Sequence, residues 1–262
     1  MFNKPNDKHH GKIAEIIGFN RQGKYRLKVP GRKTAICVAA SDIAQVLPPV
    51  PQLPILPPGA NAEKVLMVGD GDRSFSTAYA MRHPDLHIFS STLDTEEECE
   101  EKYGDFNAGL LSAAGHTVMY EVDARFVHEL PHTFTFIYFN FPHKGDLSAS
   151  GLSDLIEEFL ASAIQVLKPY VLFFMIFLIF FSGGSIYVSV MNTTWYSQRL
   201  RVRDWIRAVP NLTRVNRRIG YLDAYRTLGY IHKKTNNNSQ AGGSDEEVTY
   251  KFAHALLPPQ AP

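Results

Sequence analysis

Two short stretches bring together residue types that can do chemistry. In the first, Gly69-Asp70-Gly71-Asp72, glycines alternate with carboxylates, and Ser74 follows shortly after. Glycine has no Cβ, so the backbone can turn sharply there and approach a ligand closely. Two negative charges would repel a pyrophosphate and attract a cation. The loop therefore favours a cationic cofactor without phosphate, such as S-adenosylmethionine; ordinary turn aspartates in solvent are the alternative interpretation.

The second stretch is Asn140-Phe141-Pro142-His143. The amide oxygen of Asn140 and a backbone carbonyl fixed by Pro142 can converge on one N–H group and so orient a nitrogen for attack on a methyl donor. His143 can stack on a base or accept a proton. Asp146, just beyond, is a rival base. A proline turn with an asparagine cap is the alternative without chemistry.

Buried strands must hold both stretches in place. The apolar run at 65–68 predicts a strand that is covered on both faces and stops at Gly69, and a helix over 76–82 follows, capped by Ser74 or Ser76. Further strands are predicted at 87–93, 117–122 and 134–139, the last leading into Asn140. The pattern indicates an α/β fold with a doubly wound, mostly parallel sheet, in which ligands bind at the carboxyl ends of the strands.

Acidic residues follow two of these strands. Asp94 lies at the end of the second strand, where such folds hydrogen-bond a ribose diol, although it also suits the N-cap of a helix over 95–103. Asp123 ends the third strand, where a carboxylate can accept a hydrogen bond from an adenine amino group. We expect both side chains at the cofactor site.

Composition bounds the domain organisation. The chain has 262 residues, of which 45% are hydrophobic, and this is enough for one full core. We expect an N-terminal extension at 1–46, which includes a strand at 24–29, then a stiff proline-rich linker at 47–60 and one domain at 61–262. The two cysteines have no metal-ligand spacing, so we expect no metal and a reduced intracellular compartment. The N-terminus has no apolar signal core.

An apolar run, Tyr170–Ser182, interrupts this domain before a predicted fifth strand at 186–190. It is too short to cross a membrane, which takes roughly 20 apolar residues. We expect it to be extra to the fold, either a translated intron or other gene-model error or a surface insertion.

The segment 199–234 is basic, with ten Lys or Arg against two Asp. Arginines and tryptophans interleave near Trp205 in a predicted amphipathic helix, which suits phosphate contact and base stacking; a solvated basic helix face is the alternative. A polar loop at 235–247 and a last strand at 248–253 complete the prediction.

Taken together, these motifs resemble the ribosomal RNA uracil-N3 methyltransferase family of fungi and its plant and protist relatives. The resemblance rests on Val-Gly-Asp-Gly-Asp-Arg-Ser-Phe-Ser at 68–76, Ser-Thr-Leu-Asp-Thr-Glu-Glu-Glu at 91–98, Val-Asp-Ala at 122–124 and Phe-Asn-Phe-Pro-His-Lys-Gly at 139–145, with further likeness at 167–169 and 229–235. It covers about residues 64–253. Arg73 departs from the family pattern, which more often has an aromatic residue there.

The resemblance implies a class I, Rossmann-like methyltransferase that uses S-adenosylmethionine and methylates N3 of an unpaired uridine in large-subunit ribosomal RNA. It implies cofactor binding by the glycine loop and two acids (Gly69, Asp70, Gly71, Asp72, Ser74, Asp94 and Asp123) and target-base contact by Asn140, Pro142 and His143. It also suggests a nucleolar location, with the cytoplasm as the alternative.

Other functions remain open at this point. A nitrogen methyltransferase acting on another RNA or on a protein amide would keep the same site residues. A non-catalytic RNA-binding relative would bind RNA through the basic segment without binding a cofactor. We expect a monomer and no membrane anchor.

Overall fold

The computed structural model describes the backbone of residues 15–19, 25–28, 36–38, 53–56, 62–104, 106–143, 149–169, 171–175, 178–194, 196, 200–231 and 247–255. Contacts divide the chain into two compact units, Met1–Gln52 and Leu53–Pro262. Each unit is described by itself.

The first unit contains a three-stranded antiparallel sheet in the order β1-β2-β3. Its strands are β1 (Glu15–Phe19), β2 (Tyr25–Lys28) and β3 (Ile36–Val38). The strand predicted at 24–29 is confirmed as β2, where apolar and basic residues alternate.

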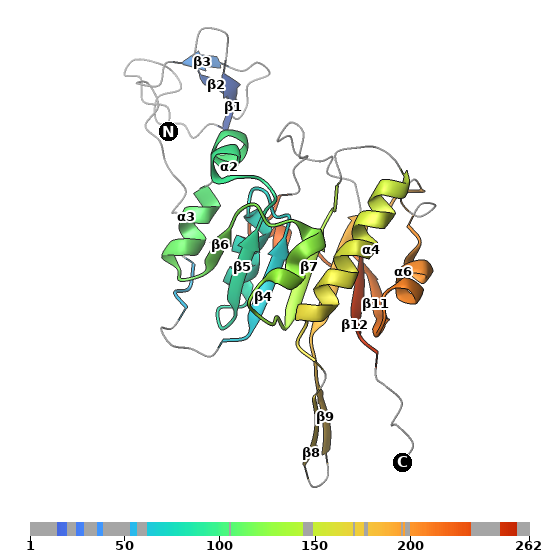
Figure 1. The fold of residues 1–262 in the computed structure, drawn as a ribbon. Helices are drawn as coiled ribbons and strands as arrows, with labels where there is room; N and C mark the ends of the chain where they lie inside the picture. The colour runs from blue at the N-terminus through green and yellow to red at the C-terminus, as the bar shows by residue number, and fades with distance from the viewer. Residues whose placement is uncertain are drawn as a thin grey trace, which may run out of the picture. The chain divides into compact units, whose positions relative to one another are not determined.

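The second unit is built on a seven-stranded sheet in the order β11-β12-β10-β7-β4-β5-β6 (Figure 1). Neighbouring strands are parallel except for β12, which runs antiparallel to both β10 and β11. The strands are β4 (Lys64–Val68), β5 (His87–Ser91), β6 (Thr117–Met119), β7 (Phe136–Asn140), β10 (Ser185–Met191), β11 (Leu212–Ile219) and β12 (Glu247–His254). The doubly wound, mostly parallel sheet expected from the sequence is thus confirmed.

Helices cover both faces of this sheet, and their bounds are α1 (Ser74–Arg82), α2 (Glu96–Tyr103), α3 (Phe106–Ala113), the 3-10 helix η2 (Ala124–Glu129), α4 (Ala149–Val166), α6 (Val202–Ala208) and α7 (Asp223–Arg226). On one face α4, η2 and α6 pack against Leu66, Ile137 and Val188. On the other face α1, α3 and α7 pack against Val65 and Met67. Because successive side chains of β4 enter opposite cores, its continuous apolar run is explained by burial on both faces.

Most predicted strands are confirmed, with shifted ends. The third strand stops at Met119 rather than continuing to Val122, because Glu121 has a left-handed φ of 55° and its N–H donates to the carbonyl of Asp94. The fourth begins at Phe136, and the preceding Phe134 forms an isolated bridge with Leu167.

The apolar segment expected to be extra to the fold forms a hairpin of its own. Strands β8 (Val171–Met175) and β9 (Leu178–Ser182) pair antiparallel and belong to a separate two-stranded sheet. The hairpin extends from the edge of the main sheet at which β10 begins (Figure 1). At its base the N–H of Gly184 donates to the carbonyl of Lys168 at 2.9 Å, so the chain leaves and re-enters the fold at one point.

Part of the predicted proline-rich linker packs on the second unit. Leu53 is buried against the core beneath α1 and α3, and the N–H of Leu56 donates to the carbonyl of Ala114. Residues 47–52 and 57–60 lie outside the described part of the chain. No helix in the described ranges is both long and apolar enough to span a membrane.

Candidate active site

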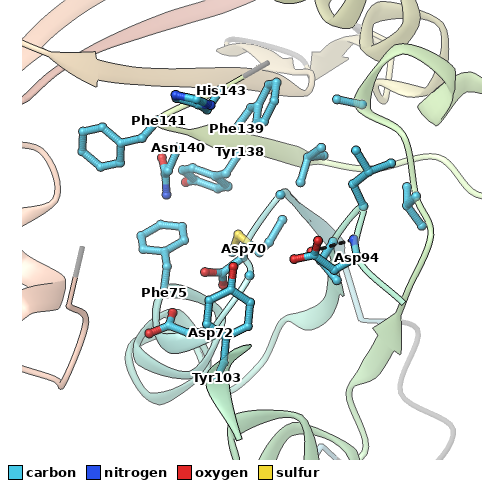
Figure 2. Close-up of a pocket in the computed structure, with 18 of the residues that line it drawn as sticks. Asp70, Asp72, Phe75, Asp94, Tyr103, Tyr138, Phe139, Asn140, Phe141 and His143 are labelled. Atoms are coloured by element: carbon cyan, nitrogen blue, oxygen red, sulfur yellow. Dashed lines mark hydrogen bonds between the residues drawn. The ribbon is translucent and has the colours of Figure 1, made fainter. Parts of the chain in front are cut away.

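A cavity of about 230 Å³ opens where β4, β5 and β7 end (Figure 2). Figure 2 shows acidic side chains on one side of it and Asn140 and His143 on the other. Its walls include most of the predicted site residues, namely Gly69, Asp70, Gly71, Asp72, Asp94, Asp123, Asn140 and His143. Two predicted residues, Ser74 and Pro142, are buried just behind the wall.

The glycine loop is held by its own aspartates. Asp70 accepts from the backbone N–H of Ser76 at 2.7 Å, and Asp72 accepts from the N–H of Ser74 at 3.1 Å and from its hydroxyl at 2.8 Å. The prediction that Ser74 or Ser76 caps the helix is therefore wrong. The two acids satisfy the first N–H groups of α1, since a helix N-terminus attracts negative charge.

Arg73 occupies the N-cap position of α1 with a left-handed φ of 56° and no capping hydrogen bond from its side chain. Its side chain is fully buried behind the loop. There the guanidinium lies 4.6 Å from the centre of the Tyr120 ring and donates to the carbonyl of Ser90 at 3.3 Å. The residue that departs from the family pattern thus supports the loop from beneath rather than lining the cavity.

Burial and the neighbouring Asp72 raise the pKa of Asp70 to about 6, against hydrogen bonds from Ser76 and the charge of Arg73, which act to lower it. The residue keeps some exposed surface at the cavity, but its carboxyl group lies beneath the loop. Asp70 therefore changes charge close to neutral pH.

Asp94 does not cap the helix that follows it. The N-cap is Thr95, whose hydroxyl accepts from the N–H of Glu98 while the Glu98 carboxylate accepts from the N–H of Thr95. Asp94 instead points to the cavity and forms a 2.7 Å ion pair with Lys102, which raises the pKa of that lysine.

Asp123 begins η2 and accepts from the N–H of Arg125 at 2.9 Å. The guanidinium of Arg125 also donates to both carboxylate oxygens, and these bonds lower the pKa of Asp123. The carboxylate is therefore fixed and ionised where it lines the cavity.

The second predicted stretch turns sharply as it leaves β7. Asn140 accepts through its side-chain oxygen from the Ser189 hydroxyl at 2.8 Å, and the N–H of Phe141 donates to the carbonyl of Ser189. Phe141 has a left-handed φ of 53°, Pro142 is buried, and His143 is exposed at the cavity rim. This fixes the amide of Asn140 and leaves the imidazole accessible. The rival base Asp146 lies outside the described residues.

Sequence reasoning missed Tyr103, whose ring also lines the cavity. A Cβ placed on Gly71 would lie 2.8 Å from the Tyr103 hydroxyl oxygen, so the absence of a side chain at Gly71 makes room for the ring. Burial and the charge of Asp94 raise the pKa of Tyr103 to about 12, which keeps its hydroxyl protonated. No local sequence signal links the two residues. Gly71 lies in the loop after β4 and Tyr103 at the end of α2, and only the fold brings them together.

The predicted role of Trp205 in base stacking is wrong. Trp205 is the buried residue of α6, and its indole N–H donates to the Ser153 hydroxyl at 3.0 Å. Arg201, Arg203 and Arg207 around it are exposed. Trp195, Arg199 and residues 232–234 lie outside the described part of the chain.

The chemistry of the cavity fits S-adenosylmethionine. Its described lining includes four aspartates and neither lysine nor arginine, so a cationic ligand is favoured and a pyrophosphate is not. Gly69 lies close to the Phe139 ring and Gly71 close to the Tyr103 ring, so neither position of the glycine loop has room for a side chain. Among the described residues, no group of three or more His, Cys, Asp or Glu is placed to hold a metal ion.

Fold and site together define a class of protein. Counted along the chain from β4, the strands of the main sheet lie in the order 3-2-1-4-5-7-6, with the seventh antiparallel. This order, with a carboxylate-lined glycine loop after the first strand, defines a class I, Rossmann-like methyltransferase that uses S-adenosylmethionine. The chain belongs to the BMT5-like family, described as rRNA (uridine-N3-)-methyltransferase, whose model matches residues 66–233. It is therefore an rRNA (uridine-N3) methyltransferase.

Solved structures that are similar to the chain include the following three. TrmN from Thermus thermophilus is 16% identical with a TM-score of 0.45, and the match covers 74% of this chain but only 44% of that one. The 30S ribosomal A1408 methyltransferase from an uncultured bacterium is 12% identical with a TM-score of 0.47, covering 74% of this chain and 89% of that one. The 16S rRNA methyltransferase KamB is 15% identical with a TM-score of 0.43, covering 75% and 90%. No curated protein sequence matches the chain.

Proposed function

We propose that the chain methylates N3 of an unpaired uridine in large-subunit ribosomal RNA within the cavity at the ends of β4, β5 and β7. The observation that supports this is a juxtaposition. A cavity wall rich in carboxylates, suited to a cationic cofactor, faces an asparagine and a histidine that are suited to an N–H group.

Gly69 and Gly71 would lie against the methionine part of the cofactor, close to the carboxylates of the loop. Asp94 would accept from the ribose hydroxyls and Asp123 from the adenine amino group, each already fixed by a neighbouring cation. When bound, the cofactor supplies an electrophilic methyl group.

The chain's own residues would prepare the nitrogen. Uracil N3 carries one hydrogen on its Watson-Crick edge, so the base must be unpaired or flipped out to present it. Asn140, held by Ser189, would orient this N–H. His143 at the rim would take the proton as the N–C bond forms, and positioning would supply much of the remaining rate enhancement.

The test is methyl transfer to large-subunit rRNA that lacks the modification, read as 3-methyluridine by nucleoside mass spectrometry. Small-subunit rRNA, tRNA and a protein mixture serve as competing acceptors. We expect His143→Ala to lower the rate by roughly 10²-fold or more while S-adenosylmethionine affinity stays unchanged, and Glu97→Ala, exposed on α2, to have no effect. Methylation of another acceptor, or cofactor binding with no transfer to any of them, would overturn the proposal.

We further propose a nucleolar location and a monomeric state. The family resemblance supports the first, because large-subunit rRNA is made there. Imaging of a tagged full-length chain tests the location, and light scattering tests the oligomeric state.

A further inference from the structure

A second cavity, of about 500 Å³, lies on the sheet face that α1 and α7 partly cover. Tyrosine is the commonest residue in its lining, which also includes Arg82 and Arg218, and we refer to it as the tyrosine cavity. Tyr138 lines both this cavity and the methyltransferase cavity, so the two cavities share a lining residue.

The rings are arranged as stacking surfaces. Tyr138 and Tyr187 are nearly parallel, at 7° with ring centres 4.5 Å apart, and Tyr187 and Tyr221 lie at 19° and 5.5 Å. Tyr138 is buried, whereas Tyr187 and Tyr221 are half-buried and keep part of their surface open. Flat aromatic surfaces of this kind stack well against nucleobases of any sequence.

Three cationic side chains lie near rings of this cluster. The guanidinium of Arg218 lies 5.9 Å from the Tyr221 ring centre, that of Arg82 lies 5.7 Å from the Tyr225 ring centre, and the ammonium of Lys251 lies 5.7 Å from the Tyr187 ring centre. Arg82 and Arg218 are exposed. Asp85 also lines the cavity, but the cations outnumber it.

The tyrosine hydroxyls give the cavity polar groups as well. Tyr138 donates to the Tyr79 oxygen at 3.3 Å, and the Tyr138 and Tyr221 oxygens are 3.0 Å apart. Burial raises the pKa of all three hydroxyls, so they stay protonated, and Tyr221 is the one of the three residues that is only half-buried. Rings for a base face, hydroxyls for a base edge and cations for a phosphate together match a nucleotide.

We propose that the tyrosine cavity binds a nucleotide that neighbours the target uridine in the same RNA strand. The base lies against Tyr187 and Tyr221, and the phosphate lies near Arg82 and Arg218. This rests on the proposed function, because the shared wall at Tyr138 puts the neighbouring nucleotide within reach only if the uridine occupies the first cavity. The chain then recognises at least two unpaired nucleotides.

The experiment uses the full chain and a short unpaired RNA that contains the target uridine. Tyr187→Leu removes the ring and keeps an apolar side chain, whereas Tyr187→Phe keeps the ring and serves as the matched control. We expect Tyr187→Leu to raise the KM for RNA about tenfold, with kcat and S-adenosylmethionine affinity unchanged and with near-normal values for Tyr187→Phe. Arg218→Gln should raise the same KM and reduce its salt dependence.

A second measurement does not depend on how the variants fold. The same RNA carries photoreactive 5-iodouridine beside the target, and the cross-linked peptide should contain Tyr187 or Tyr221. Cross-links confined to α6, or an unchanged KM in Tyr187→Leu while the wild-type chain methylates uridine, would overturn the nucleotide site alone. Absence of uridine methylation by the wild-type chain would count against the proposed function, and the cross-link would still test the tyrosine cavity.

Discussion

Deleting residues 170–182 should leave the methyltransferase unit folded and able to bind its cofactor. The deletion makes Lys168-Pro169-Gly183-Gly184 consecutive. The existing 2.9 Å bond from the Gly184 N–H to the Lys168 carbonyl then becomes the closing bond of a four-residue β-turn. Proline at the second position and glycine at the third are the residues that a type II turn prefers.

The expected change in stability is small and favourable. The segment that this bond closes, counted with Lys168 and Gly184 included, shortens about fourfold, and since each doubling of a loop costs about 0.6 kcal/mol, its closure becomes easier by about 1.2 kcal/mol. The flanking bonds, from the Phe134 N–H to the Val166 carbonyl and from the Ser185 N–H to the Thr135 carbonyl, do not involve the deleted residues. The free energy of unfolding should therefore stay equal or rise by about 1 kcal/mol.

Urea unfolding and calorimetric titration of S-adenosylmethionine into both chains provide the measurement. Gly184→Ala in the full chain is the control that shows whether urea unfolding detects a disturbance at the base of the hairpin. Its Cβ would lie 2.6 Å from the Leu167 Cδ1 atom, so this variant should destabilise the unit. A loss of more than about 3 kcal/mol on deletion, or loss of cofactor binding, would show that the hairpin is an integral part of the core and refute the reasoning.

Three further predictions concern the predicted cofactor site. Asp94→Ala should weaken S-adenosylmethionine binding about tenfold to a hundredfold, the range for a lost hydrogen bond to a charged group. Asp70 should make stability depend on pH: its folded pKa of about 6 exceeds the ordinary 3.8, so its contribution is fully present below pH 3.8 and is lost as the pH rises through about 6, by at most about 3 kcal/mol. Asp70→Asn should remove that slope in urea unfolding. Gly71→Ala should displace Tyr103 and cost about fivefold in cofactor affinity, and Tyr103→Ala should restore part of it.

Each of these has a contrary outcome. Unchanged affinity in Asp94→Ala, with Glu97→Ala as the surface control, would remove Asp94 from the ribose site. Parallel pH profiles for the wild type and Asp70→Asn would show that this carboxylate does not carry the pH dependence. An equal loss of affinity in Gly71→Ala with and without Tyr103 would mean that the added methyl group acts on the ligand directly.

Features set by a short run of sequence were predictable. The apolar run of β4 has to be buried on both faces, and the glycines that end it have to turn, so the strand and loop were predicted where they lie. The positions of Asp94 and Asp123 followed from the same reasoning, because parallel strands end at one edge of a sheet.

Features that depend on distant residues were not predictable. Trp205 has the same amphipathic surroundings as an exposed helix residue, and it is the packing of α6 into the core, where the indole meets Ser153 of α4, that buries it. The capping serines were misassigned because the carboxylates of Asp70 and Asp72 reach forward into the helix N-terminus and take the role first. The tyrosines of the second cavity are spread over several elements, so their spacing shows no pattern.

The antiparallel direction of β12 has a consequence for how this enzyme can change its substrate. Since β11 ends and β12 begins at the edge that holds the active site, the chain arrives there at Gly220 and leaves at Glu247, where the Gly220 N–H donates to the Glu247 carbonyl. The described part of the stretch between them, residues 220–231, contributes Tyr230 and Ile231 to the cavity. Mutation, lengthening or shortening of this stretch can therefore alter which RNA is admitted while the scaffold that binds the methyl donor is inherited intact.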